Sequence, residues 1–198
     1  MAQSVILSLI RHGQTAANQQ RQYIGSTDEP LIETLPRCTL YEPMIVYGSD
    51  LMRCVQTAHA YFPHATYEAD ERLREIHFGD YELQTYAQLQ HDQHYRAWID
   101  NPFTTTPPNG ESLSDFVARV DAAFVDIVQT ASHYTFVVHG GVIRHLLTRF
   151  SGNGLSFSYQ QAAHHTCYTL TWDSLHDWKE GQLCTSLSVV PITANALM

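Results

Sequence analysis

Two histidines, each placed directly after an apolar run and followed by glycine, are the residues of this sequence best suited to chemistry. Residues 5–10 are an apolar run that leads into Arg11, His12 and Gly13, and residues 134–138 lead in the same way into His139. Short runs of this composition predict buried strands. If the two strands are neighbours, their ends bring both imidazoles to one crevice, where α/β sheets bind ligands.

A histidine next to an arginine at a strand end suits the transfer of a phosphoryl group. Neutral imidazole is a nucleophile, and a histidine with its ordinary pKa of about 6.5 is largely neutral at pH 7. Arg11 attracts the phosphate dianion, and Gly13 has no side chain to obstruct it. We therefore predict that His12 is the nucleophile of a phosphomonoester site. The alternative interpretation is a buried, hydrogen-bonded structural histidine.

The pattern of apolar residues predicts an α/β fold. We expect strands at residues 5–10, 45–48, 65–68, 134–138, 165–172 and 183–190. We expect helices at residues 51–62, 84–99, 111–131 and 141–150. Strands that alternate with helices indicate βαβ units, and hence a three-layer fold in which helices flank a mostly parallel sheet. A length of 198 residues fits a single domain over 1–198.

Composition excludes several classes of partner. The chain has 11 basic and 20 acidic residues, for a formal charge of −9, which argues against a nucleic-acid partner. The sequence contains no apolar stretch of membrane-spanning length and no basic start typical of a signal peptide. Its four cysteines lack the spacing of a metal or redox pair, so we expect reduced thiols and a cytoplasmic location.

Four segments resemble, in order along the chain, the motifs of the histidine phosphatase superfamily, also called phosphoglycerate mutase-like. They are residues 11–18, 49–58, 73–82 and 138–144. The resemblance implies the fold of that family and a phosphatase reaction in which His12 is phosphorylated on a ring nitrogen and then hydrolysed. It implies no metal and no cofactor.

The same resemblance assigns the other site residues. Arg11, Arg53 and His139 would form an electrostatic clamp around the transferring phosphoryl group. His139 suits this role best when it is protonated, a state that a nearby phosphate favours. Further contacts to the substrate are expected from Asn18, Gly25 and the backbone amide of Gly140.

Glu75 is the expected acid and base. Other acidic residues crowd this part of the chain, and only the register from Leu73 to Gly79 within the family-like segment singles it out. A carboxyl group beside a dianion resists ionisation, so it can protonate the leaving oxygen. After the alcohol departs, the ionised group can accept a proton from the attacking water.

Other reactive residue types have simpler interpretations. The pairs His91 with His94 and His164 with His165 suggest a metal site, but solvated histidines are favoured because no acidic or cysteine partner has ligand spacing. Cys54 is expected to be a packed helix cysteine. Surface roles and functional roles are about equally favoured for the remaining isolated arginines, namely Arg21, Arg37, Arg72, Arg119 and Arg149.

Residues 79–110 are expected to form a cap beside the pocket. This stretch has a single basic residue, Arg96, and five prominent aromatic ones, namely Tyr81, Tyr86, Tyr95, Trp98 and Phe103. A mutase that acts on doubly anionic phosphoglycerate needs more positive charge than this cap supplies. Aromatic faces suit a nucleoside-like alcohol, although the same residues could simply pack the cap.

Residues 107–112 and 139–144 are similar to segments of α-ribazole phosphatases, which remove a 5′-phosphate during assembly of the cobalamin nucleotide loop. The resemblance implies a small-molecule phosphomonoester as the partner. The alternatives are a phosphoglycerate mutase-type phosphotransferase and a broad-specificity phosphatase. A non-catalytic phosphate-binding interaction module is a further alternative, and such a module would be expected to have lost His12 or Glu75.

The crossover at residues 32–43 departs from the family pattern. Relatives have a helix of several turns here, whereas Pro36 and Pro43 permit at most about two turns. We expect one face of the sheet to be thinly covered, so that residues 35–41 contribute to a homo-oligomer surface. Folding back of residues 189–198 is the alternative cover.

Overall fold

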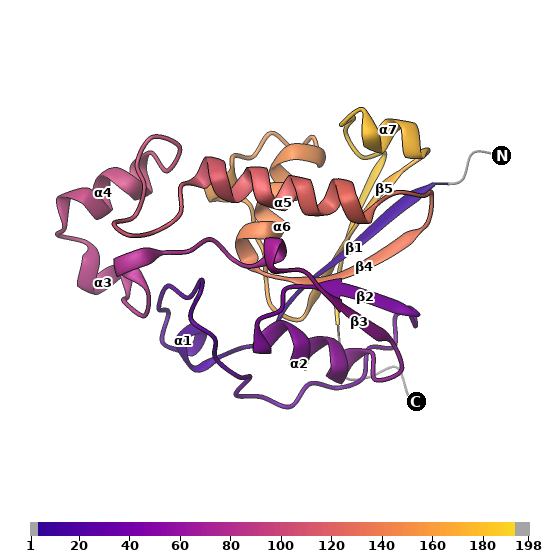
Figure 1. The fold of residues 1–198 in the computed structure, drawn as a ribbon, viewed down its shortest axis with the longest axis horizontal. Helices are drawn as coiled ribbons and strands as arrows, with labels where there is room; N and C mark the ends of the chain where they lie inside the picture. The colour runs from indigo at the N-terminus through magenta and orange to yellow at the C-terminus, as the bar shows by residue number, and fades with distance from the viewer. Residues whose placement is uncertain (1–3, 193–198) are drawn as a thin grey trace.

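The protein is built on one six-stranded sheet. The computed structural model describes residues 4–192, and the strand order is β3-β2-β4-β1-β5-β6 (Figure 1). The strands are β1 (Val5–Arg11), β2 (Ile45–Gly48), β3 (Thr66–Ala69), β4 (His133–Val138), β5 (Thr166–Trp172) and β6 (Ser186–Pro191).

The first four strands of the chain run parallel to one another, β5 runs in the opposite direction, and β6 pairs antiparallel with β5. β1 pairs in parallel with β4 on one side and antiparallel with β5 on the other. The prediction of a mostly parallel sheet is confirmed. Because β5 runs against β1, its start lies beside the end of β1, with Ile10 opposite Cys167. The residues just before β5 therefore reach the same sheet edge as His12.

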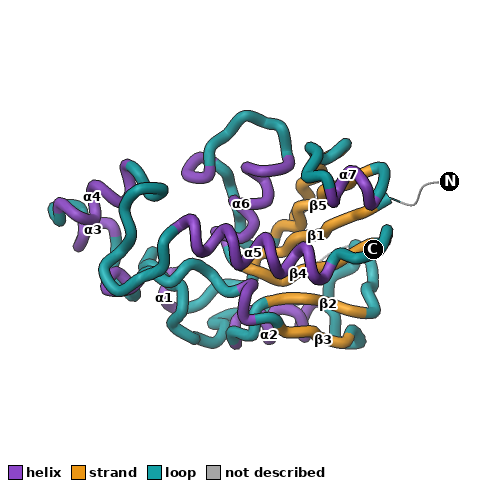
Figure 2. The backbone as a smooth tube through the Cα atoms, turned by 45° about the horizontal axis from the view of Figure 1, so that its top comes forward, coloured by secondary structure: helices purple, strands orange, loops and turns teal. Residues whose placement is uncertain are grey.

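Helices cover both faces of the sheet, as a three-layer fold requires (Figure 2). On one face α5 (Leu113–Ile127), α6 (Gly140–Phe150) and α7 (Leu175–Lys179) pack against the larger core cluster, in which Phe116, Phe136 and Trp172 are fully buried. On the other face α2 (Met52–Tyr61) packs against a smaller cluster. A short helix, α1 (Ala16–Gln19), follows β1.

The predicted helix at 84–99 is two helices, α3 (Tyr86–Leu89) and α4 (Gln93–Asp100). The break has a local cause, since the Asp92 side chain accepts a hydrogen bond from the Tyr95 amide at 2.8 Å and so starts a new helix. α5 also ends at Ile127 rather than near 131. Three 3₁₀ turns complete the set, η1 (Glu71–Leu73), η2 (Gly79–Tyr81) and η3 (Phe157–Tyr159).

Residues 79–110, with η2, α3 and α4, lie at one end of the molecule (Figure 1). Their aromatic residues mostly pack against one another, since Tyr81, Tyr95 and Trp98 form a buried cluster with Leu89. The packing interpretation is thus right for these three aromatic rings. Large parts of Tyr86 and Phe103 remain exposed.

The crossover at 32–43 forms no helix, yet it covers the sheet face that we expected to be thinly covered. Leu35 and Cys38 are buried in the smaller core cluster, and the Cys38 amide donates to the Tyr61 carbonyl at 2.9 Å. Tyr41 packs on Phe62 with 5.7 Å between ring centroids. The expectation of an uncovered face is therefore wrong, because an extended segment fills the space of a helix. The alternative expectation is that residues 189–198 cover this face, and of these residues 193–198 lie outside the described residues.

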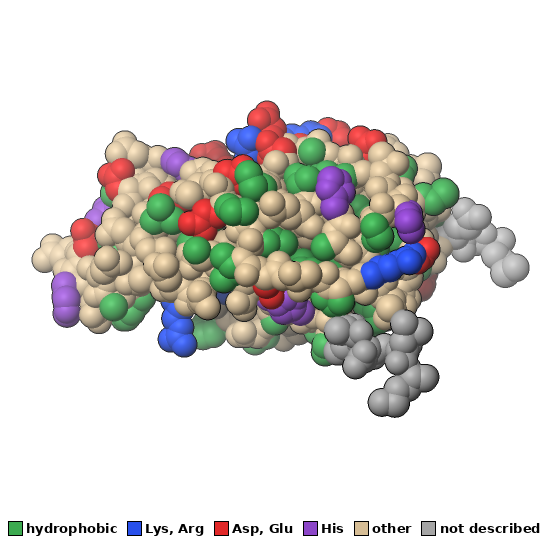
Figure 3. All heavy atoms as spheres, turned by 90° about the horizontal axis from the view of Figure 1, so that it is seen from below, with side chains coloured by type: hydrophobic (Ala, Val, Ile, Leu, Met, Phe, Trp, Pro, Cys, Tyr) green, Lys and Arg blue, Asp and Glu red, His purple; other side chains and the backbone are tan. Residues whose placement is uncertain are grey.

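Basic side chains are scattered over the face seen in Figure 3 rather than gathered in one patch. Within residues 4–192, no helix is both long and apolar enough to cross a membrane.

Burial of Leu35 generates a stability prediction. Leu35→Ala should lower the free energy of unfolding by about 2–4 kcal/mol, because the side chain is 8% exposed and its removal leaves a cavity. Leu40→Ala is the control, with an expected change of about 0.5 kcal/mol or less, since Leu40 is 44% exposed. Urea unfolding followed by circular dichroism measures both. Equal effects would contradict the role of Leu35 as cover for the sheet.

Candidate active site

The two predicted strand ends meet. The His12 amide donates to the Val138 carbonyl at 3.0 Å, which continues the pairing with β4 one residue past the end of β1. The imidazoles of His12 and His139 lie with their ring centroids 5.0 Å apart. The predicted convergence of the two histidines is confirmed.

His12 is held in one orientation and kept neutral. Its Nδ1 lies 2.7 Å from the Gly13 carbonyl oxygen, so Nδ1 carries the proton and donates it there. Burial holds the pKa of His12 well below its usual range, and the charges of Arg53 and Arg11 lower it further. The lone pair of Nε2 is therefore available for bonding.

Arg53 lies in the first turn of α2, fully buried beneath the two histidines. Its Nε donates to Nδ1 of His139 at 3.3 Å, and its two terminal nitrogens donate to the carbonyls of Thr27 at 2.8 Å and Gly25 at 2.7 Å. A buried guanidinium needs such acceptors to offset its lost hydration. The loop at 25–27 therefore fixes where Arg53 lies.

His139 is fully buried, and its ring contacts Arg53 in the first turn of α2. Burial lowers its pKa well below the ordinary value, and Arg53 and His12 add to this effect. The neighbouring Cys54 thiol lies 3.5 Å from Nε2 of His139, and burial raises its pKa to about 12. Cys54 is thus the packed, unreactive cysteine that the sequence predicts.

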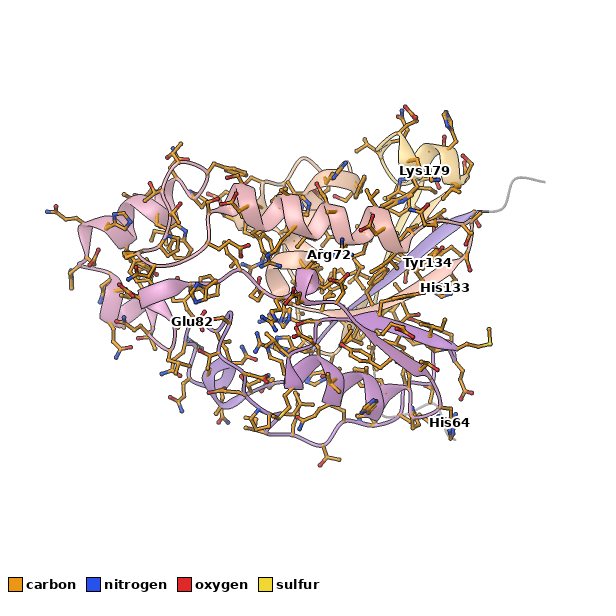
Figure 4. The ribbon with its side chains drawn as sticks, in the orientation of Figure 1. His64, Arg72, Glu82, His133, Tyr134 and Lys179 are labelled. Carbon is orange, nitrogen blue, oxygen red and sulfur yellow. The ribbon has the colours of Figure 1, made fainter. Side chains whose placement is uncertain are left out.

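Gly25 uses both of its backbone polar groups within the loop that holds Arg53, and its contact with substrate stays a prediction. Its amide donates to the Glu82 carboxylate at 3.0 and 3.1 Å, and its carbonyl accepts from Arg53. Glu82 also accepts from the amides of Ser26 and Thr27, and Figure 4 labels its position at the level of this loop. Glu82 therefore ties the loop that orients Arg53.

Glu75 is fixed by the start of α6. Its Oε2 accepts from the Gly141 amide at 2.8 Å, and a Cβ at Gly141 would lie 2.1 Å from Oε1, so a side chain there would displace the carboxylate. Arg119 on α5 holds the backbone of this segment, because it donates to the carbonyls of Arg74 and Glu75 at 2.8 and 2.9 Å. Arg119 is thus a positioning residue, not a surface charge.

A cavity of about 400 Å³ opens beside these groups. Five residues predicted from the sequence line this cavity, namely Arg11, His12, Asn18, Glu75 and Gly140. Arg53 and His139, which were predicted to belong to the clamp, are not among its lining residues and are fully buried. The first turn of α6 faces the cavity through Gly140 and Gly141, which favours an anion there.

A second cavity of about 270 Å³ adjoins the first, since both are lined by Tyr23, Glu75 and Arg144. The surface of the second is mostly apolar, and its further lining includes Phe78, Trp98, Leu113 and Phe157. The two cavities give the site a cationic end and an apolar end.

Among the lining residues of the first cavity that were not predicted as part of it are three ionisable ones, namely Arg21, Arg144 and His164. His164 Nδ1 donates to the His12 carbonyl at 2.7 Å, and burial next to Arg11 lowers its pKa to about 4. Its position just before β5 was visible, but the antiparallel pairing that brings it to His12 was not. Arg144 could have been suspected because it lies near the start of the helix predicted to follow His139.

The part of the chain from 4 to 192 contains no group of three or more His, Cys, Asp or Glu side chains placed to hold a metal ion. The histidines that suggested such a site make other contacts. His94 bonds to the Thr106 carbonyl, while His164 belongs to the cavity.

The fold and the site agree with a comparison to known families. The profile of the histidine phosphatase superfamily, branch 1, matches residues 7–180, so the chain belongs to this family. With the phosphatase names of its relatives, this membership identifies the chain as a phosphatase.

Individual relatives share the fold but differ in their named substrates. The adenosylcobalamin/alpha-ribazole phosphatase of Salmonella typhimurium is 30% identical over 157 residues, which cover 72% of this chain and 78% of the relative. The glucosyl-3-phosphoglycerate phosphatase of Mycobacterium tuberculosis is also 30% identical, over 160 residues that cover 69% and 71%. The crystal structure of the alpha-ribazole phosphatase from Shigella flexneri aligns with a TM-score of 0.71 at 27% identity, covering 83% and 89%.

The contacts of Glu82 generate a prediction about pH. Burial acts to raise the pKa of Glu82, but hydrogen bonds from Thr27 and the amides of Gly25, Phe78 and Ser26 outweigh it and hold the pKa below its ordinary 4.5. The ionised form thus stabilises the fold above pH 4.5, and this contribution is lost as the pH falls through the lowered pKa.

Glu82→Gln should therefore lower Tm at pH 7, and the difference from wild type should shrink as the pH falls below about 4. Thermal unfolding between pH 3 and 7 measures this difference. The exposed Glu68→Gln on β3 is the control, and we expect it to leave Tm nearly unchanged. A Tm difference for Glu82→Gln that is constant with pH would contradict the assignment.

Proposed function

We propose that this chain is a metal-independent phosphomonoesterase that works through a phosphohistidine on His12. The observation that carries the proposal is the state of His12: the ring is neutral, Nδ1 is tied to the Gly13 carbonyl, and the residue lines a cationic cavity with Glu75. In the first step Nε2 attacks phosphorus and forms a P–N bond as the P–O bond to the alcohol breaks.

The cations around His12 are suited to stabilise the transferring phosphoryl group. Arg11 lines the cavity, and its Nε is buried without a hydrogen-bond acceptor among residues 4–192. Arg53 is a second buried cation next to neutral His139, whose ring lies 5.0 Å from that of His12, and Asn18 and the Gly140 amide are neutral donors at the cavity wall. Preorganised donors of this kind act on charge that develops during transfer.

Glu75 is suited to handle the proton. In its acid form it gives a proton to the leaving alkoxide oxygen in the first step. In the second step the carboxylate takes a proton from water as the water oxygen attacks phosphorus, and the P–N bond breaks. Inorganic phosphate leaves, and His12 is again free.

Among phosphomonoesters we favour α-ribazole 5′-phosphate as the substrate. The support is the name of the Salmonella relative and the apolar cavity that could take a flat ring beyond the phosphate. The mutase-type alternative gains one argument, because Arg21 and Arg144 bring positive charge to the cavity from outside the cap. Assays of the purified protein with each substrate decide between them: hydrolysis of α-ribazole 5′-phosphate supports the phosphatase, and conversion of 3-phosphoglycerate supports the mutase.

Two further inferences concern the whole chain. We infer a cytoplasmic location, which is supported by the free state of Cys38, Cys54, Cys167 and Cys184. We also infer one domain over residues 1–198 with residues 79–110 as its cap, supported by a family match over residues 7–180.

A comparison of two leaving groups tests the proposed chemistry. His12→Ala should abolish turnover of both an alkyl phosphate and p-nitrophenyl phosphate, because no nucleophile remains. Glu75→Gln should slow the alkyl ester by the ~10²–10⁴-fold typical of general acid catalysis, and the nitrophenyl ester much less, because nitrophenolate leaves without a proton.

Steady-state rates of the purified variants provide the measurement. Full turnover by His12→Ala would exclude His12 as the nucleophile, and equal losses on both esters would exclude Glu75 as the acid. A wild-type chain that binds phosphate but hydrolyses neither ester would instead support the non-catalytic module.

A further inference from the structure

Arg144 lies where the two cavities of the site adjoin. It lines both the cationic cavity, together with Arg11 and His12, and the apolar one, together with Trp98 and Phe157. On α6 it is four residues after Gly140 and three after Gly141, so these residues share one helix face. This face forms the wall that runs from the phosphate end to the apolar end.

The Arg144 guanidinium has no partner within the described chain, residues 4–192. Its Nε is buried and finds no hydrogen-bond acceptor there, and no carboxylate of those residues forms an ion pair with it. By contrast, Arg149 on the same helix pairs with Asp121. A buried donor without an acceptor is destabilising, and in native proteins such groups call for a functional reason.

The position of Glu75 sets the distance of Arg144 from the reacting atoms. Glu75 accepts from the Gly141 amide, so under the proposed function the ester oxygen lies near the start of α6. Arg144 is almost one helical turn further along, about 5 Å by the rise of an α-helix. It therefore lies at the passage from the phosphate end to the apolar end, where it lines both cavities.

We propose that Arg144 determines substrate specificity by donating hydrogen bonds to oxygen atoms of the alcohol part, at the point where a flat or apolar ring enters the second cavity. This inference rests on the proposed function and names the substrate class: phosphate esters of sugar-like alcohols that carry a ring, as in nucleoside 5′-monophosphates. The sugar oxygens would face Arg144, and the ring would lie among Tyr23, Phe78 and Trp98.

The ratio of kcat/KM for two substrates tests the proposal. One is α-ribazole 5′-phosphate, and the other is phenyl phosphate, whose alcohol part has no oxygen beyond the ester. Arg144→Gln should lower this ratio by about 10- to 100-fold, as expected for loss of a charged hydrogen bond. Arg144→Lys should recover part of the ratio, and Arg149→Gln should leave it at the wild-type value.

Two results would overturn the proposal. If Arg144→Gln lowers kcat/KM equally for both substrates, Arg144 contacts the phosphate. If it changes kcat/KM for neither substrate, Arg144 does not contact the alcohol. If Arg144→Gln fails to fold in a thermal-unfolding assay, the ratio is taken from Arg144→Lys, where a wild-type value would likewise overturn it. Failure of the proposed function is distinct, since the wild-type chain would then hydrolyse neither substrate.

Discussion

The burial of two imidazoles with two arginines at one sheet edge is the constraint on which the rest of the site depends. His12 and His139 lie within 5.0 Å of each other between ring centroids, and Arg53 donates to His139 from below. If both histidines were protonated, they and the two arginines would place four positive charges in one site of low dielectric constant. The groups with the lowest pKa therefore give up their protons. The two histidines are those groups, which leaves neutral nucleophilic imidazole beside permanent cations.

The surrounding structure keeps this arrangement in place through backbone contacts. Glu82 ties the loop at 25–27, whose carbonyls accept from Arg53. Arg119 holds the backbone on either side of Glu75, and Gly141 at the start of α6 holds its carboxylate. None of these residues needs to touch the reacting atoms. They fix the angles at which the cations and the carboxylate meet the cavity, as preorganised sites require.

The parts of the fold that were predicted correctly depend on local sequence. The run at 5–10, the run at 134–138 and the glycines after them predict the two strands and the meeting of His12 with His139, and Pro36 and Pro43 predict the absence of a long crossover helix. The site residues that were missed or left undecided depend on contacts between distant segments. The sequence leaves Arg119 undecided between a surface and a functional role because its acceptors lie in residues 72–75, and it indicates a solvated His164 because only the antiparallel β5 brings that residue to His12. Neither contact has a periodic signal in the sequence.

The central claim is that His12 is neutral at physiological pH with its proton on Nδ1, so that Nε2 is free to attack phosphorus. Nuclear magnetic resonance of ¹⁵N-labelled imidazole in the wild-type protein, with His12 assigned from the His12→Ala spectrum, measures both features between pH 5 and 8. We expect the Nδ1–H tautomer throughout and no titration of His12 in this range, because burial, Arg53 and Arg11 hold its pKa well below the ordinary 6.5. A titration centred near pH 6.5, or a proton on Nε2, would contradict it.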